Sequence, residues 1–326
     1  IGTRVELRLN DPSDSSIARK LSATLRADQP GRVLTDASLF AQVALPLPAD
    51  GAEVAVGAGL EELAARSREA WAGPQAPPIR LLPEVLDPVE LPDALDEPEL
   101  VPLGLRQDTM APAMLDLARD QHLLVLGDTR TGKTTLLRGI IDGLVQRSGP
   151  EELVVALYDV RGGLAEACPE DYLGGRATNA TLAVGLSTAI ATELEKRSDA
   201  TGQGASAVGP RVLVVVDDYD ILASGGTDPL RPLLPYLPAA RDMRLHVVLT
   251  RPVAGASRAL YDPVLQALRD TGGSGFLMAG ERSEGQVFPG LYAEQLPPGR
   301  GRWVRRGERP RLVQIANFVE GVPDAP

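Results

Sequence analysis

A glycine-rich segment of eight residues sets the strongest limit on the fold of this chain. Residues 127–134 read Gly-Asp-Thr-Arg-Thr-Gly-Lys-Thr, with an apolar run before them and a helical pattern after them. This spacing, G-x-x-x-x-G-K-[S/T], lets backbone N–H groups curl around a phosphate chain, while the following helix directs its positive end at the same anion. The segment therefore predicts a phosphate-binding loop between a strand and a helix.

The expected ligand of this loop is ATP with Mg²⁺. Lys133 should act catalytically by reaching the β- and γ-phosphates, and the Thr134 hydroxyl should be a metal ligand. We expect nine consecutive residues to contact the nucleotide: Gly127, Asp128, Thr129, Arg130, Thr131, Gly132, Lys133, Thr134 and Thr135.

A second buried run, residues 212–216, delivers two carboxylates at its end. Asp217 is expected to hold the metal through a coordinated water, because ligands bind at the carboxyl ends of strands in open α/β sheets. Asp218 occupies the catalytic position that usually carries a Glu to orient the attacking water, and it is one methylene shorter. The shorter side chain predicts slow turnover.

Two further strand ends carry candidate residues. Thr250 and Arg251 end the run that begins at residue 245 and are expected to sense the γ-phosphate, although Arg251 could equally be a surface cation. Residues 159–163, Asp-Val-Arg-Gly-Gly, end the run that begins at residue 153 and would border either the nucleotide or a subunit interface.

The pattern of apolar runs indicates the fold class. Four nearly unbroken Val/Leu runs, at 122–126, 153–158, 212–216 and 245–249, alternate with helical patterns. Strands of this kind are buried on both faces, which is typical of a mostly parallel sheet flanked by helices. The expected class is α/β.

Composition excludes several classes of protein. The net charge of −11 argues against a general polyanion binder, so nucleic acid is an improbable partner. Cys168 is the single cysteine, which excludes an intrachain disulfide and fits a reducing, cytoplasmic location. No apolar run approaches the roughly 18 residues that span a bilayer. His122 and His246 each open a buried run, where core packing is the expected role.

One local stretch is strongly basic. Residues 300–311 contain six arginines, one glutamate and Trp303. A nucleic-acid site would use the arginines for phosphates and Trp303 for base stacking. The favoured alternative is an exposed hairpin that turns at Gly307 and buries Val304, Leu312 and Ile315.

The chain is expected to have three parts. Residues 1–71 would be the C-terminal remnant of a preceding copy of the same domain, because Pro30-Gly31-Arg32 matches Pro298-Gly299-Arg300. Within this part we expect strands at 5–9 and 39–47, a helix from residue 13 or 14 to 25, and a helix at 59–71. Residues 72–99 form a proline-rich acidic linker, in which 79–83 could dock on a neighbouring surface. Residues 100–326 form the domain with the phosphate loop.

Several segments resemble the FtsK/SpoIIIE motor family. They are residues 103–105, Met114-Leu115-Asp116-Leu117, and His122-Leu123-Leu124-Val125-Leu126-Gly127. Within that family, residues 177–179, 253–258 and 297–301 are similar to the C-terminal ATPase modules of EccC-type type VII (ESX) secretion ATPases, the third module above all. The resemblance implies a RecA-like P-loop NTPase core that binds ATP and Mg²⁺.

The resemblance also implies partners. They are other ATPase domains of the same chain, a secreted WXG100-family substrate recognised by its C-terminal signal, and a membrane secretion complex reached through a missing N-terminal part. The module would then lie at the inner, cytoplasmic face of the cell membrane.

Departures from the family pattern favour tight ATP binding with slow hydrolysis. Asp218 replaces the catalytic Glu, and the helix at 181–195 has no Arg or Lys that could act on a neighbouring subunit. One alternative is a DNA-translocating FtsK/SpoIIIE motor, against which the acidic charge argues. A kinase or other phosphotransferase with the same loop is more remote.

Overall fold

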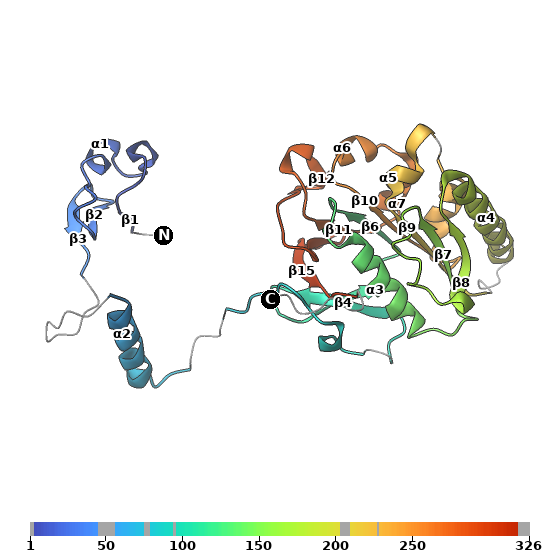
Figure 1. Cartoon of the computed structure of the whole chain (residues 1–326), viewed down its shortest axis with the longest axis horizontal. Coiled ribbons are helices and arrows are strands. Elements are labelled where there is room, and N and C mark those ends of the chain that lie inside the picture. Colours follow the sequence, from blue (N-terminus) through green and yellow to red (C-terminus); the bar gives the residue numbers. More distant parts are fainter. Residues whose placement is uncertain are drawn as a thin grey trace. The chain divides into compact units, whose positions relative to one another are not determined.

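The computed structural model describes residues 3–44, 56–74, 79–93, 96–202, 209–226 and 228–318. Its contacts divide the chain into two units, residues 1–78 and 79–326 (Figure 1). The boundary between the two units, after residue 78, lies inside the linker expected at residues 72–99. The division into three parts expected from the sequence stays a prediction.

The first unit holds a small antiparallel sheet in the order β1-β2-β3. Its strands are β1 (Val5–Glu6), β2 (Arg32–Thr35) and β3 (Phe40–Gln42), and its helical elements are η1 (Pro12–Asp14), α1 (Arg19–Ser22) and α2 (Val56–Ala70). Val33 and Leu34 are buried, whereas Val5 and Leu7 are more than half exposed. Few apolar side chains are therefore covered here.

Two expectations for this unit are wrong in detail. The helix expected to run to residue 25 is broken, because Ser15 is extended (ψ 125°) and its hydroxyl accepts hydrogen bonds from the N–H groups of Ile17 and Ala18. The first strand is only two residues long and is not half-buried. The second expected strand is described only to residue 44, and its continuation to 47 lies outside the described residues.

The second unit is built on a ten-stranded mixed sheet in the order β5-β4-β15-β14-β11-β6-β10-β9-β7-β8. The strands are β4 (Leu100–Arg106), β5 (Pro112–Asp116), β6 (His122–Leu126), β7 (Leu153–Asp159), β8 (Leu173–Ala177), β9 (Arg211–Asp217), β10 (Leu245–Arg251), β11 (Ser274–Met278), β14 (Arg300–Val304) and β15 (Arg311–Ile315). Strands β11 through β8 are parallel, and the other end of the sheet is antiparallel. The α/β class and the four buried runs are confirmed.

The helical elements of this unit connect the strands. They are η2 (Pro88–Glu90), α3 (Lys133–Val145), η3 (Glu170–Tyr172), α4 (Ala180–Gly202), α5 (Tyr219–Leu222), η4 (Ser224–Gly226), η5 (Arg231–Ala239), α6 (Ala256–Ala259), α7 (Pro263–Asp270) and η6 (Arg282–Glu284), with a separate pair of strands, β12 (Gln286–Phe288) and β13 (Leu291–Tyr292).

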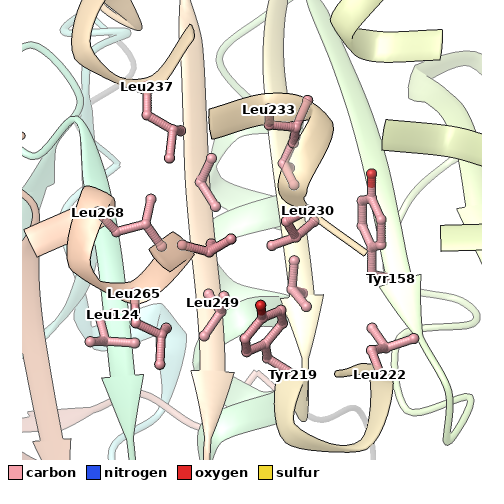
Figure 2. Close-up of a cluster of buried hydrophobic side chains, with 14 of the residues drawn as sticks. Leu124, Tyr158, Tyr219, Leu222, Leu230, Leu233, Leu237, Leu249, Leu265 and Leu268 are labelled. Carbon is pink, nitrogen blue, oxygen red and sulfur yellow. The ribbon is translucent and has the colours of Figure 1, made fainter. Parts of the chain in front are cut away.

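Both faces of the parallel strands are buried. Leu123 and Val125 of β6 pack in a core with α3, while Leu124 and Leu126 pack in a second core with η5 and α7. Figure 2 shows this second core, with Leu265 and Leu268 of α7 and Leu230, Leu233 and Leu237 around η5 gathered over the sheet. Double-sided burial explains why these runs lack the polar alternation of a half-exposed strand.

The antiparallel end contains the expected hairpin. Strands β14 and β15 pair directly, and the turn between them includes Gly307 at φ +79°. The pattern of burial differs from the expectation, because Trp303 is 6% exposed whereas Val304 and Leu312 are only partly buried. Alternation in β14 places residues 301 and 303, not 304, on the core side.

Part of the expected linker is docked on this unit. Leu82 and Leu86 are buried, and Arg300 donates hydrogen bonds to the carbonyls of Leu82 and Pro83. Ile79 and Leu81 remain largely exposed. The apolar contact expected from residues 79–83 is thus made by Leu82 together with the later Leu86.

Candidate functional site

The phosphate loop joins β6 to α3, as the sequence predicts. Arg130 (φ +63°) and Gly132 (φ +104°) are left-handed, and the second value favours glycine strongly. The amides of Gly127 and Asp128 donate to the carbonyls of Arg251 and Ala279, at 3.1 and 2.9 Å. The loop amides that remain for an anion therefore lie nearer to α3, where the first helical N–H groups lack intrahelical acceptors.

Asp128 fixes the loop to the segment after β10. Its Oδ1 accepts hydrogen bonds from the amides of Val253 (3.1 Å) and Ala254 (3.4 Å), and its carbonyl accepts from Thr131 Oγ1 (2.9 Å) and Lys133 Nζ (3.2 Å). The Asp128 carboxylate is thus committed to the protein. A positioning role explains its presence in the loop better than direct contact with a phosphate.

A buried carboxylate lies beside the first turn of α3. Thr134 Oγ1 donates to Asp217 Oδ2 at 2.7 Å, and Thr250 Oγ1 donates to Asp217 Oδ1 at 2.6 Å. Burial raises the pKa of Asp217, and the nearby Asp218 raises it further. The two residues expected to hold the metal, Thr134 and Asp217, are therefore in contact.

The space around this pair fits a metal ion shared with phosphates. A Cβ at Gly163 would come within 3.0 Å of Thr134 Cγ2 and 3.8 Å of Asp217 Oδ2, so the glycine keeps this side open. The described parts of the chain hold no group of three or more His, Cys, Asp or Glu side chains suited to a metal. Mg²⁺ usually combines one or two carboxylates with substrate phosphates and waters, and the donor set here agrees with that.

Asp218 lies next to this pair in a left-handed conformation (φ +51°). Its amide donates to Thr250 Oγ1 at 2.9 Å, which ties it to β10. Its carboxylate lies between two cations, with Arg161 Nε 2.7 Å from Oδ2 and Lys133 Nζ 3.7 Å from Oδ1. The carboxylate that the sequence predicts to orient water is thus already paired.

Arg161 and Gly163 belong to the site, although the sequence placed their segment only at its border. Register pairs Asp159 of β7 with Asp217 of β9, so both strands end at the same edge. The Asp159 carboxylate accepts from the amides of Gly163 (3.0 Å) and Leu164 (2.8 Å) and so shapes the loop after β7. An acid at a strand end followed by Arg-Gly-Gly was the available signal.

Thr250 and Arg251 have separate environments. Thr250 is fully buried and orients Asp217 and Asp218 through the hydrogen bonds above. Arg251 is 6% exposed, its Nε donates to the Pro252 carbonyl, and burial lowers its pKa against the opposing effect of Asp220. This burial excludes the alternative of a surface cation, and among the described residues no side chain of the phosphate loop bonds to the guanidinium.

A cavity of about 370 Å³ opens beside Lys133, Thr134 and Thr135. Arg130 and Gly132 of the loop also line it, and its remaining walls come from distant parts of the second unit: Glu84, Val85, Leu86, Pro298, Gly299, Gln314, Ile315, Ala316 and Asn317. The amide of Asn317 donates to the Leu86 carbonyl, and the amide of Gly299 donates to the Thr131 carbonyl, both at 2.8 Å. The docked linker segment is therefore a wall of the site, which the sequence did not predict.

Comparison with known proteins identifies the family. The FtsK/SpoIIIE family model matches residues 90–199, a range that contains the phosphate loop. The ESX secretion system protein EccC of Thermomonospora curvata is 36% identical over 97% of this chain, and EccC4 of the Mycobacterium tuberculosis ESX-4 system is also 36% identical over 97%. The chain belongs to the FtsK/SpoIIIE family.

A solved structure extends this similarity. ATPases 2 and 3 of T. curvata EccC, in complex with a signal sequence peptide, match 97% of this chain with a TM-score of 0.74 at 36% identity. The chain covers 58% of that structure but only 25% of the length of each of the two relatives above. The ten-stranded sheet of the second unit and its helices thus form the P-loop ATPase fold of the FtsK/SpoIIIE family.

The remaining candidates behave as core residues of this FtsK/SpoIIIE domain. His122 and His246 are buried, and burial lowers their pKa values to about 4 and about 3. Burial raises the pKa of Cys168 to about 11, which keeps the thiol protonated and unreactive near neutral pH. None of the described helices is both long enough and apolar enough to cross a bilayer.

Proposed function

We propose that this chain is an ATP-binding module of a type VII protein secretion motor, which binds Mg²⁺ with ATP and hydrolyses the nucleotide slowly. One observation carries the proposal: Thr134 Oγ1 and Asp217 Oδ2 are 2.7 Å apart at the end of a loop whose Lys133 is buried. This arrangement supplies a phosphate cradle, a cation and two metal-side oxygens within one small volume.

Each residue has a distinct task in this proposal. The loop amides near α3 bind the phosphate chain, Lys133 balances charge on its terminal groups, and Thr134 and Asp217 hold the metal. Bound Mg²⁺ supplies neutralisation of the charge that develops on the phosphate oxygens. Thr250 keeps Asp217 in position, and Gly163 leaves the room that the metal needs.

The cavity lined by residues 84–86 and 314–317 is the proposed place of the base and ribose. It adjoins Thr134 and Thr135, so a nucleotide whose phosphates lie on the loop would extend into it. Val85, which is largely exposed, supplies apolar surface for a ring, and the partly buried Asn317 supplies an amide.

Slow hydrolysis is supported by the surroundings of Asp218. A catalytic base must be within hydrogen-bond reach of the attacking water, and this carboxylate is one methylene short and paired with Arg161. Bound ATP would then serve mainly to stabilise the native state, by about 2.7 kcal/mol at a concentration 100 times its dissociation constant.

The partners are proposed from the relatives. A T. curvata relative was solved with a signal sequence peptide, which supports recognition of secreted WXG100-type substrates through a C-terminal signal. We also propose that residues 1–71 end a preceding ATPase copy, that 72–99 link it to the domain at 100–326, and that a membrane secretion complex holds the module at the inner face of the cell membrane.

Thermal unfolding in the presence and absence of Mg-ATP tests the nucleotide site. The wild type should melt higher with Mg-ATP, whereas Lys133→Ala and Thr134→Ala should lose most of that increase. Thr188→Ala, an exposed threonine on α4, is the matched control and should keep it. A melting curve of the wild type that Mg-ATP leaves unchanged would exclude the proposed site.

Two further measurements test turnover and substrate recognition. Single-turnover hydrolysis should be slow for the wild type and faster for Asp218→Glu, and a wild-type rate near ~10 s⁻¹, common among enzymes, would contradict slow turnover. In a pull-down, a WXG100 heterodimer should be retained only with its C-terminal tail; equal retention without the tail would remove the signal-recognition proposal.

A further inference from the structure

A second cavity, of about 210 Å³, lies on the antiparallel end of the sheet. It shares no lining residue with the cavity beside the phosphate loop. Its walls come from β4, β5, β14, β15 and the β14–β15 turn: Arg106, Pro112, Ala113, Met114, Trp303, Arg305, Glu308, Arg311 and Val313. Three arginines and one glutamate thus surround a small space.

The arginines of this cavity differ in their partners. Arg305 Nε donates to the buried Asp120 at 2.9 Å, so its charge is balanced. Glu308 is shared between Arg311 (3.5 Å) and Arg119 (2.5 Å). Arg106 forms no ion pair within the described part of the chain, and its Nε is buried without an acceptor. The cavity therefore carries an excess of positive charge, centred on Arg106.

Trp303 adds a second donor without an acceptor. Its side chain is buried, and its indole Nε1 finds no hydrogen-bond partner among the residues described. Buried N–H groups are normally satisfied, so two of them without acceptors on residues that line one cavity, Arg106 Nε and Trp303 Nε1, call for an acceptor from outside. A carboxylate suits both, because it only accepts hydrogen bonds and its two oxygens match the fork of an arginine.

We propose that this cavity binds a carboxylate carried by a peptide, with Arg106 and the Trp303 N–H as the donors. Pro112, Met114 and Val313 provide apolar contact for the methylene groups or backbone next to the carboxylate. The site goes beyond the proposed nucleotide function and does not depend on it.

An adjoining cavity favours a peptide over a small free acid. It is about 520 Å³, shares Glu308 and Arg311 with the 210 Å³ cavity, and adds Gln107, Asp108, Arg302, Arg309, Pro310 and Leu312. Arg302 is paired with Glu294 and Arg311 with Glu308, so a chain of several residues could place one carboxylate at Arg106 and a further acidic group at Arg309.

The same geometry argues against nucleic acid as the occupant. Base stacking needs an open aromatic face, but Trp303 packs edge-on against Phe276, with ring centres 5.8 Å apart, and Arg305 lies 4.7 Å over its ring. A peptide carboxylate needs no open aromatic face, because it accepts hydrogen bonds from donors in the cavity wall.

Fluorescence anisotropy with labelled peptides on the full chain, without nucleotide, tests the proposal. The probes are hexaglutamate blocked at both ends, hexaglutamine blocked at both ends, and a Gly-Ser hexapeptide with a free C-terminal carboxylate. At least one carboxylate probe should bind and hexaglutamine should not; which of the two binds identifies a side-chain or a terminal carboxylate as the source. Failure of both carboxylate probes, or equal binding of hexaglutamine, would overturn the proposal.

Variants locate the site. Arg106→Gln should weaken binding about tenfold or more, because a charge-assisted hydrogen bond is lost. Trp303→Phe, which keeps an aromatic ring without the N–H, should weaken it severalfold. Arg306→Gln, an exposed neighbour that lines neither cavity, is the control of equal charge and should have little effect. An equal loss in Arg306→Gln would show nonspecific attraction and reject the site.

The folding of the variants is checked separately from their binding. Melting curves should show that Arg106→Gln and Arg306→Gln unfold like the wild type, and Arg106→Lys should still bind less tightly, since lysine keeps the charge but loses the planar fork. A single-stranded DNA oligonucleotide that displaced the peptide through Arg106 would instead establish a nucleic-acid site and overturn the peptide assignment.

Discussion

Arg161 Nε lies 2.7 Å from Oδ2 of Asp218, and Lys133 Nζ lies 3.7 Å from the other oxygen of the same carboxylate. Arg161 comes from the loop after β7, Asp218 from the end of β9 and Lys133 from α3, so three elements meet at one acid. The Arg161 side chain is 67% exposed, whereas the Asp218 side chain is 17% exposed. The carboxylate that we propose to orient water is thereby held by an arginine of its own chain.

Removal of this arginine should release Asp218. We expect Arg161→Ala to raise the single-turnover rate of ATP hydrolysis severalfold, because the carboxylate becomes free to accept a hydrogen bond from water. Arg161→Lys, which keeps the charge, should remain close to the wild type. A lower rate in Arg161→Ala would mean that the arginine assists the phosphate instead.

Gly163 and Gly162 offer a matched pair for the metal site. In Gly163→Ala the added Cβ would meet Thr134 Cγ2 at 3.0 Å, so we expect weaker Mg²⁺-dependent ATP binding in a titration with and without EDTA. Gly162 has no atom near its Cβ position but has φ +75°, so Gly162→Ala should cost about 1 kcal/mol of stability without a specific loss of metal dependence. Equal metal dependence in both variants would contradict the assignment of Gly163.

The docked linker segment should contribute to both stability and nucleotide binding. Leu86 is fully buried, so Leu86→Ala should lower the free energy of unfolding by about 2–5 kcal/mol and also weaken ATP binding through the damaged cavity wall. Val89 is 82% exposed, and Val89→Ala should change the free energy by less than about 0.5 kcal/mol. Chemical denaturation and ATP titration of the two variants provide the comparison.

The buried histidines predict a loss of stability in mild acid. Burial lowers the pKa of His246 to about 3 and of His122 to about 4, whereas both bind protons near 6.5 in the unfolded chain. Above pH 6.5 neither histidine affects the balance; as the pH falls below 6.5, the unfolded state gains protons that the folded state does not, and stability decreases.

The His246→Gln variant isolates this contribution. Between pH 6.5 and 4.5 its free energy of unfolding should fall by about 2 kcal/mol less than that of the wild type, since one pKa unit corresponds to about 1.4 kcal/mol per group. Carboxylates such as Asp217 titrate in both proteins and cancel in the difference. Parallel stability curves for the two proteins would contradict a depressed pKa at His246.

Short local signals account for the parts of this molecule that the sequence predicts well. A few consecutive residues suffice to predict the phosphate loop, which ends in Lys133 and Thr134. The same holds for the buried strands that precede Gly127 and Asp217. The role of Leu86 could not be foreseen, because its burial depends on Asn317 and Ile315 more than 200 residues away. The pairing of Arg161 with Asp218 was equally hidden, since it depends on the register of β7 with β9.

The hydrogen bond from the Gly299 amide to the Thr131 carbonyl joins the phosphate loop to the start of β14. Gly299 immediately precedes β14, and that same strand carries Trp303 into the arginine-lined cavity. The five residues of β14 span about 17 Å. The start of this strand therefore lies at the phosphate loop, and its far end lines a separate pocket. Because β14 pairs with β11 on one side and with β15 on the other, the two pockets are joined by a single strand in the interior of the sheet.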